Sequence, residues 1–277
     1  MPLPRLSPAH VRRFRKTVYA HFARHGRGLP WRKTRDSYRI LVSEVMLQQT
    51  QVDRVVPIYK SFIQTFPSFA ALARAPLRRI LLAWQGLGYN RRALALHRIA
   101  ELVVKNHRGK LPSDERQLLE LPGIGPYTAR AVLAFAWNKP VAFMETNIRS
   151  VYLHHFFPRR GGIPDTDLVP LIEQTLDRKN PRRWYWALMD YGSALKRTVP
   201  NPNRRSAHHA KQSRFEGSLR QLRGLLLRGI AKQPAALEKN LLAKVPANRR
   251  VQARRALAAL ERDGFIKKTA RGYAVAR

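Results

Sequence analysis

Apolar residues recur at three- and four-residue steps along most of the chain, which is the spacing of amphipathic helices rather than of strands. Over residues 43–66 the pattern predicts two helices, with a polar stripe formed by Glu44, Gln48 and Gln51. Further helices are predicted over residues 69–75, 77–84, 91–106, 114–120, 128–137, 147–157, 165–176 and 181–195. We therefore predict an all-α fold, built of short helices that are connected locally.

A different organisation is predicted after residue 199. The segment 199–214 is rich in Asn, Pro, Arg and His without an apolar period, so it is predicted to be a basic loop or linker. Beyond it the pattern predicts helices over 217–230, 235–243 and 248–263, followed by the β-prone pieces FIKK and GYAVA. Three helices and a two-stranded ribbon are the layout of a winged-helix module. Such a module either contacts DNA or a protein, or caps the preceding domain without a partner.

The net charge of the chain indicates what kind of molecule it binds. The chain has 277 residues, with 53 Lys and Arg against 17 Asp and Glu and a net charge of +36. Positive charge spread along a chain that also carries Trp, Tyr and Phe favours nucleic acid as the partner, although it does not separate an enzyme from a binding protein. No apolar run approaches the roughly 18 to 20 residues of a membrane helix, and no secretory segment is evident. We expect a cytoplasmic, nucleoid-associated protein without membrane contact.

The chain contains no cysteine. This composition excludes a disulfide framework, a thiolate zinc site, an iron-sulfur cluster held by Cys and a Cys nucleophile. We expect neither a metal nor a cofactor.

The strongest local motif is LPGIGPYTARAV, residues 121–132. Gly123 and Gly125 permit a tight turn between two helices, and the backbone N–H groups that open the second helix form an anion site. Such a hairpin holds a DNA phosphate without reading sequence. Because glycine also ends helices routinely, a purely structural turn is the alternative.

Four ordered motifs, at residues 29–52, 84–98, 121–132 and 145–151, resemble those of the helix-hairpin-helix (HhH-GPD) DNA glycosylases, in particular the MutY-type adenine glycosylases. The resemblance covers residues 28–195. It implies a two-subdomain helical fold with a DNA groove, acting as a monomer on double-stranded DNA that holds a mispaired or damaged base. The corresponding domains are 1–27 with 135–214, 28–134 with the hairpin, and a winged-helix-like domain at 215–277.

The resemblance also implies the catalytic residues. Cleavage of an N-glycosidic bond needs an acid for the leaving base and negative charge beside the oxocarbenium-like sugar. Glu44 matches the catalytic acid, and its apolar sequence VSEVML favours the protonated form. Glu145, followed by Asn147, stands where the superfamily has an aspartate, and its extra methylene moves the charge by about 1.5 Å. Tyr127 stands where bifunctional relatives carry a lysine, and because a phenol forms no imine we expect a monofunctional enzyme.

The remaining matches concern DNA and the target base. Gln48, Gln49 and Tyr89 match residues that fill the stack when a nucleotide is flipped out. The hairpin contacts are predicted at Leu121, Gly123, Ile124, Gly125, Tyr127 and Thr128, and the base pocket at Leu29, Trp31, Arg32, Trp186 and Met189. Trp186 replaces the acidic or amide residue that contacts adenine in relatives, and its ring accepts no hydrogen bond from the exocyclic amine.

Three functions therefore stay open. The first is removal of adenine opposite G or 8-oxoguanine, with Glu44 as the acid and Glu145 as the stabilising carboxylate. The second is removal of another base, such as T or U opposite G. The third is a non-catalytic protein that binds damaged or structured DNA. The residues after Gly217 are too few for the Nudix-like domain that many adenine glycosylases carry, so recognition of the opposite base is unassigned.

Overall fold

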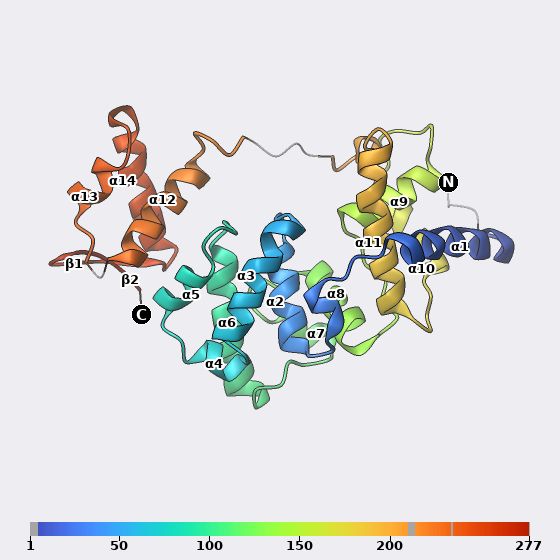
Figure 1. Cartoon of the computed structure of the whole chain (residues 1–277), viewed down its shortest axis with the longest axis horizontal. Helices are drawn as coiled ribbons and strands as arrows, with labels where there is room; N and C mark the ends of the chain where they lie inside the picture. Colours follow the sequence, from blue (N-terminus) through green and yellow to red (C-terminus); the bar gives the residue numbers. More distant parts are fainter. Residues whose placement is uncertain (1–4, 210–213, 234, 277) are drawn as a thin grey trace. The chain divides into compact units, whose positions relative to one another are not determined.

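The computed structural model describes residues 5–209, 214–233 and 235–276, and in these residues nearly all regular structure is helical (Figure 1). The prediction of a mainly α-helical fold is confirmed. The chain forms two compact units: unit 1 comprises residues 1–41, 113–120 and 124–211, and unit 2 comprises residues 42–112, 121–123 and 212–277. Residues 212–277, which include the predicted winged-helix-like domain, group with residues 42–112 in unit 2.

Unit 1 is built around α11, which packs against α9 and α1. Its elements are α1 (Pro8–His25), η1 (Pro30–Lys33), the start of α2 (Ser37–Leu47), α7 (Glu115–Leu119), α8 (Pro126–Trp137), α9 (Thr146–Phe156), α10 (Asp165–Thr175), α11 (Pro181–Thr198) and η2 (Pro202–Arg205). Trp184, Tyr185 and Tyr152 are fully buried in its core, and the Phe14 ring meets Trp184 edge-on at 5.8 Å. These large aromatic side chains bury much apolar area and fix how the helices pack.

One glycine allows α11 to approach the start of α9. A Cβ atom placed on Gly192 would lie 2.0 Å from the carbonyl oxygen of Asn147. No side chain fits at that distance, so α11 needs glycine where it crosses the first turn of α9.

The segment after α11 is not a free linker over its described part, residues 199–209. The Asn203 amide donates to the carbonyl of Thr146 at 3.1 Å and to the hydroxyl of Ser150 at 2.6 Å. Ser206 forms a β-bridge with Ile163. Of the two predicted alternatives, a basic loop agrees with the structure of these residues and a free linker does not, because side-chain hydrogen bonds hold them against α9. Residues 210–213 lie outside the described part.

Unit 2 combines a helical body with the C-terminal module. The body holds the rest of α2, α3 (Val52–Thr65), α4 (Phe69–Ala73), α5 (Leu77–Ala83) and α6 (Arg91–His107). Phe62, Phe66 and Trp84 are buried in its core. The module, residues 214–276 as described, holds α12 (Leu219–Lys232), α13 (Glu238–Ala243), η3 (Ala247–Arg249), α14 (Arg250–Arg262), β1 (Ile266–Thr269) and β2 (Gly272–Val275).

The order of elements in the module is the one predicted. Strands β1 and β2 pair antiparallel, from Ile266 opposite Val275 to Thr269 opposite Gly272. The predicted helix over 235–243 begins only at Glu238. Its first residues differ from the prediction because Ala236 exchanges backbone hydrogen bonds with Tyr273 of β2. This pairing competes with helix formation and wins.

We expect Gly192→Ala to destabilise unit 1. The new methyl group collides with the backbone of Asn147, and relieving the clash separates α11 from α9, at about 1–3 kcal/mol. Gly161→Ala is the matched control, since a Cβ atom there meets nothing within 4 Å. Urea denaturation measures both. Equal stability of the two variants would contradict the close approach.

Candidate functional site

Glu44 lies in α2 of unit 2 and is buried, with 4% of its surface exposed. Helix α2 ends at Leu47, Gln49 adopts a left-handed conformation with φ of 54°, and Gln51 is the N-cap of α3. The predicted polar stripe of Glu44, Gln48 and Gln51 on one helical face is therefore wrong. A turn redirects the chain immediately after Glu44 and exposes Gln49.

Arg92, at the start of α6, holds this turn. Its terminal nitrogens donate to five carbonyl oxygens at 2.6–3.2 Å, those of Val45, Met46, Gln48, Leu87 and Gly88. Burial lowers the pKa of Arg92 to about 10, which leaves it charged at neutral pH. The guanidinium thus joins the end of α2 to the loop that carries Tyr89.

The same loop brings the three predicted stack-filling residues together. Tyr89 has a left-handed φ of 46°, and its ring lies 5.4 Å from the Arg92 guanidinium. Gln48, Gln49 and Tyr89 line one cavity of about 480 Å³, with residues of the C-terminal module on its other side. Sequence reasoning identified these three residues but not Arg92, which positions them.

In unit 1, Glu145 is the N-cap of α9. Its Oε1 accepts hydrogen bonds from the backbone N–H groups of Asn147 at 2.7 Å and Ile148 at 2.8 Å. These are the backbone groups that an N-cap side chain usually satisfies, so the longer glutamate is accommodated at a position suited to aspartate. The carboxylate is held by the start of the helix rather than left to rotate.

Lys196 of α11 extends this arrangement. Its ammonium donates to Oδ1 of Asn147 at 2.8 Å, and the Asn147 amide donates to Oε2 of Glu145 at 3.1 Å. Burial raises the pKa of Glu145, while the two backbone N–H groups and then Lys196 act against that rise. Burial in turn lowers the pKa of Lys196. Sequence reasoning missed Lys196, because its partner Asn147 lies 49 positions away along the chain.

The hairpin residues divide between core and surface. Leu121, Ile124 and Thr128 are buried, Gly123 has a positive φ of 79°, and Gly125 begins α8 without a side-chain cap. The Tyr127 ring meets Phe143 edge-on at 5.9 Å in unit 1. Glycine at 123 is also required by space, because its Cβ would lie 2.9 Å from that of Ala95.

Arg32, predicted for the base pocket, is engaged by Asp190 of α11. Its guanidinium donates to both carboxylate oxygens, at 2.7 and 2.8 Å, and Arg27 donates to the same carboxylate at 2.7 Å. Burial alone would raise the pKa of Asp190, but the hydrogen bonds from Arg32 and Arg27 outweigh it and hold the pKa below its usual range. Arg32 therefore ties η1 to α11. Trp31 is buried beside it, whereas Leu29 and Met189 are half-buried.

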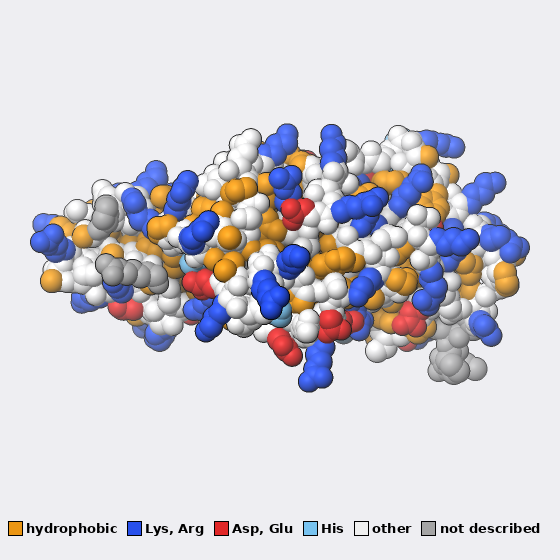
Figure 2. Space-filling model, turned by 90° about the horizontal axis from the view of Figure 1, so that it is seen from below, with side chains coloured by type: hydrophobic (Ala, Val, Ile, Leu, Met, Phe, Trp, Pro, Cys, Tyr) orange, Lys and Arg blue, Asp and Glu red, His pale blue; other side chains and the backbone are white. Residues whose placement is uncertain are grey.

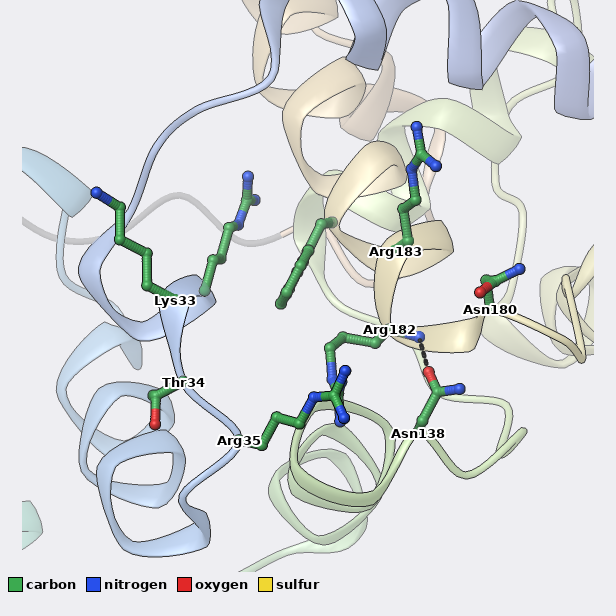
Figure 3. A pocket seen from close by; sticks show the side chains of 9 residues that line it. Lys33, Thr34, Arg35, Asn138, Asn180, Arg182 and Arg183 are labelled. Carbon is green, nitrogen blue, oxygen red and sulfur yellow. Dashed lines mark hydrogen bonds between the residues drawn. The ribbon is translucent and has the colours of Figure 1, made fainter.

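Arg32 and Trp186 line a second cavity of about 400 Å³ in unit 1 (Figure 3). The Arg32 guanidinium lies 5.6 Å from the Trp186 ring, whose other neighbour is the stacked ring of Phe135. Five of the lining residues are Lys or Arg and none is acidic. Figure 3 shows Arg35 and Arg182 side by side. The pKa of Arg182 is lowered mainly by burial and to a smaller extent by the positive charge of Arg35. The cavity is suited to an anion.

Lys and Arg side chains cover much of the face drawn in Figure 2, with few Asp and Glu among them. Within the described residues no group of three or more His, Asp or Glu side chains is arranged to hold a metal ion. None of the described helices is long and apolar enough to cross a membrane.

Comparisons with known proteins place the chain in a family. Residues 42–178 match the model of the HhH-GPD superfamily of base excision DNA repair proteins. The chain is 35% identical over 266 residues to an adenine DNA glycosylase of Mycolicibacterium smegmatis, covering 89% of this chain and 90% of that protein. It is 37% identical over 182 residues to an adenine DNA glycosylase of Mycobacterium tuberculosis, covering 64% of this chain but only 60% of the relative.

A solved thermostable thymine-DNA glycosylase is similar in structure, with a TM-score of 0.60 and 27% identity over 69% of this chain and 88% of that one. The helical fold and the hairpin are those of a helix-hairpin-helix glycosylase. The chain belongs to the HhH-GPD superfamily of base excision DNA repair proteins, as the resemblance predicted.

The iron-sulfur cluster implied by the family resemblance does not fit this chain. No cysteine is present to ligate it. The described residues that follow α11 are instead held to α9 by Asn203, as noted above.

We expect Arg92→Lys to destabilise the protein by about 2–4 kcal/mol, because an ammonium group cannot reach carbonyls on both sides as the planar guanidinium does. Arg98→Lys, at an exposed position on the same helix, is the control and should have little effect. Urea denaturation compares them. A variant Arg92→Lys as stable as the wild type would show that the carbonyl contacts do not hold the two turns.

Proposed function

We propose that this protein is a monofunctional adenine DNA glycosylase, which hydrolyses the N-glycosidic bond of a flipped-out adenine opposite G or 8-oxoguanine. The observation that carries the proposal is the similarity of the chain, over most of its length, to a relative named adenine DNA glycosylase. The chain also has a buried Glu44 in unit 2 and a helix-capping Glu145 in unit 1. These are the two carboxyl groups that the reaction requires.

In the proposed mechanism, Glu44 donates a proton to the leaving adenine, and the bond from the base nitrogen to C1′ breaks with its electron pair remaining on the base. The oxocarbenium-like sugar is stabilised by the ionised Glu145, whose orientation is fixed by the α9 N-terminus and by Asn147. A water molecule then adds to C1′, and its proton passes to the Glu44 carboxylate, which regenerates the acid. The products are free adenine and an abasic site.

Tyr127 provides no amine for imine formation, so the proposal includes no cleavage of the DNA strand by β-elimination. The hairpin from Leu121 to Thr128 is proposed to hold a backbone phosphate. The protein is proposed to act as a monomer on DNA in the cytoplasm, at the nucleoid, without metal or cofactor.

A second candidate is removal of T or U opposite G. Trp186 favours it, because the ring lies between Phe135 and Arg32 and offers adenine no hydrogen-bond acceptor. Similarity to the solved thymine-DNA glycosylase also supports it. A non-catalytic DNA-binding protein is the third candidate, but phosphate binding alone requires neither Glu44 nor the stack-filling residues.

Single-turnover base release tests the proposal on duplexes with A opposite G, A opposite 8-oxoguanine, T opposite G and U opposite G. We expect release of adenine, with strand breaks only after alkali. Glu44→Gln should lower the rate by at least about 10²-fold without loss of DNA affinity, because it removes the proton donor. Glu101→Gln, at an exposed position on α6, should leave the rate unchanged.

Any other result of this experiment contradicts the proposed function and, in two cases, supports one of the other candidate functions. Release of T or U instead of A assigns the second candidate, and tight binding without release of any base assigns the third. Strand cleavage without alkali contradicts the monofunctional assignment.

We expect Lys196→Met to move the acidic side of the pH–rate profile to higher pH. Glu145 must be ionised, so the rate falls as pH drops through its pKa, and loss of the Lys196 charge leaves the burial effect less opposed. Lys196→Arg keeps the charge and should stay near the wild-type profile. On the acidic side the Met variant should be at least about threefold slower than the Arg variant, with the gap closing as pH rises. A gap that is constant with pH would contradict this role.

A further inference from the structure

In the described residues, side-chain hydrogen bonds join the C-terminal module to the body of unit 2 at three places. Arg78 of α5 donates to the carbonyls of Ala231 at 2.7 Å and Lys232 at 3.3 Å, at the end of α12. Asp263 accepts from Arg91 of the body at 2.9 Å and from Arg223 of α12 at 2.5 Å. The third contact joins Arg220 to Tyr89.

Arg220 holds the side chain of Tyr89. Its guanidinium hydrogen bonds to the phenolic oxygen at 2.5 Å and lies 5.6 Å from the ring centroid. The Arg92 guanidinium lies 5.4 Å from the same ring. A tyrosine with a left-handed backbone is strained by about 1 kcal/mol or more, and both cations help to keep it in this position.

The module and the Tyr89 loop together line the cavity of about 480 Å³, which is open to solvent and has a volume typical of ligand sites. Gln48, Gln49 and Tyr89 line it from the body, whereas Arg220, Arg223 and Gly224 line it from α12, and Leu260 and Phe265 add an apolar wall. An amide pair, an aromatic ring and an apolar wall suit a nucleobase, and the guanidinium groups suit its phosphate.

The positive charge of its lining indicates that this cavity is a binding site rather than only a gap between packed elements. Four arginines line it, namely Arg91, Arg92, Arg220 and Arg223, and none of its lining residues is acidic. Asp263, which pairs with Arg91 and Arg223, offsets only part of this charge. Gathering like charges is unfavourable until an anion arrives, so a phosphate group would relieve the repulsion.

We propose that the C-terminal module is part of the DNA site: Arg220 positions Tyr89, and the cavity between the Tyr89 loop and α12 takes one nucleotide of the strand opposite the excised base. This inference rests on the proposed function only in assuming a DNA duplex as ligand. It assigns the recognition of the opposite strand to the module. Arg220 is a positioning residue, since it acts through Tyr89.

The test uses the full chain and a duplex with an abasic-site analogue opposite 2-aminopurine, so that binding and local unstacking are measured without catalysis. Arg220→Ala should weaken binding by about tenfold and reduce the rise in 2-aminopurine fluorescence. Arg228→Ala, an exposed arginine on the same helix and outside the cavity, removes the same charge and should weaken binding much less.

A mutant cycle separates positioning from simple charge. In a Tyr89→Ala background, Arg220→Ala should weaken binding no more than Arg228→Ala does, because its partner is gone. Tyr89→Phe removes only the hydroxyl and should reproduce part of the Arg220→Ala defect, which keeps the test decisive if the alanine variant folds poorly. An effect of Arg220→Ala that equals the control in the wild-type background, or that is unchanged in the Tyr89→Ala background, would overturn the positioning role.

Occupancy of the cavity is tested at Gly224, where a Cβ atom meets nothing within 4 Å. Gly224→Phe fills the space without changing charge and should weaken binding by at least about tenfold, whereas Gly224→Ala should bind as the wild type does. Equal binding by the two variants would show that no nucleotide enters the cavity.

The outcomes also separate this inference from the proposed function. If every variant binds as expected but the wild type releases no base, the proposed function fails and this inference stands. If the wild type does not bind the duplex, both fail.

Discussion

The hydrogen bonds of the Arg92 guanidinium are the interaction on which the Gln49 and Tyr89 turns of unit 2 depend. Two turns meet there, one after α2 and one before α6, and each contains a residue in a left-handed conformation, Gln49 and Tyr89. The carbonyl groups that such turns leave without helical partners must be satisfied, because an unpaired buried carbonyl is costly. A planar group with several fixed donors satisfies five of them at once. Glu44 directly precedes Val45, whose carbonyl group is one of the five, so the same guanidinium also holds the end of α2 that carries Glu44.

In unit 1 the start of a helix, instead of an arginine, holds the candidate catalytic group in place. Glu145 is oriented by the first N–H groups of α9, and Gly192 lets α11 come close enough for Lys196 to reach Asn147. The carboxylate, its amide neighbour and the ammonium group form a chain of hydrogen bonds whose geometry is set by backbone packing. The difference between glutamate and the aspartate usual in the superfamily is therefore absorbed by the side chain, while the backbone cap is kept.

Most helices could be predicted from the sequence because their signals are local. The pattern over residues 91–106 corresponds to α6, Arg91–His107, and the glycines of the hairpin mark the turn before α8. The prediction failed where distant residues decide: the residues before α13 pair with Tyr273 instead of forming a helix. Likewise, the sequence left a loop and a free linker open for residues 199–209, and the contacts of Asn203 with α9 decide for the loop. The partnerships of Lys196 with Asn147 and of Arg220 with Tyr89 link residues 49 and 131 positions apart, so no local pattern encodes them.

Carboxylates are the scarce component of this molecule. Asp190 neutralises Arg27 and Arg32, and Asp263 neutralises Arg91 and Arg223, so that one acidic side chain serves two basic ones at each place. Loss of one such acid leaves two cations uncompensated in a chain that already carries 53 basic residues, whereas loss of one arginine leaves the acid with a partner. At these two places the molecule is therefore unequally tolerant of mutation: Asp190 and Asp263 are under tighter constraint than the arginines that they pair with.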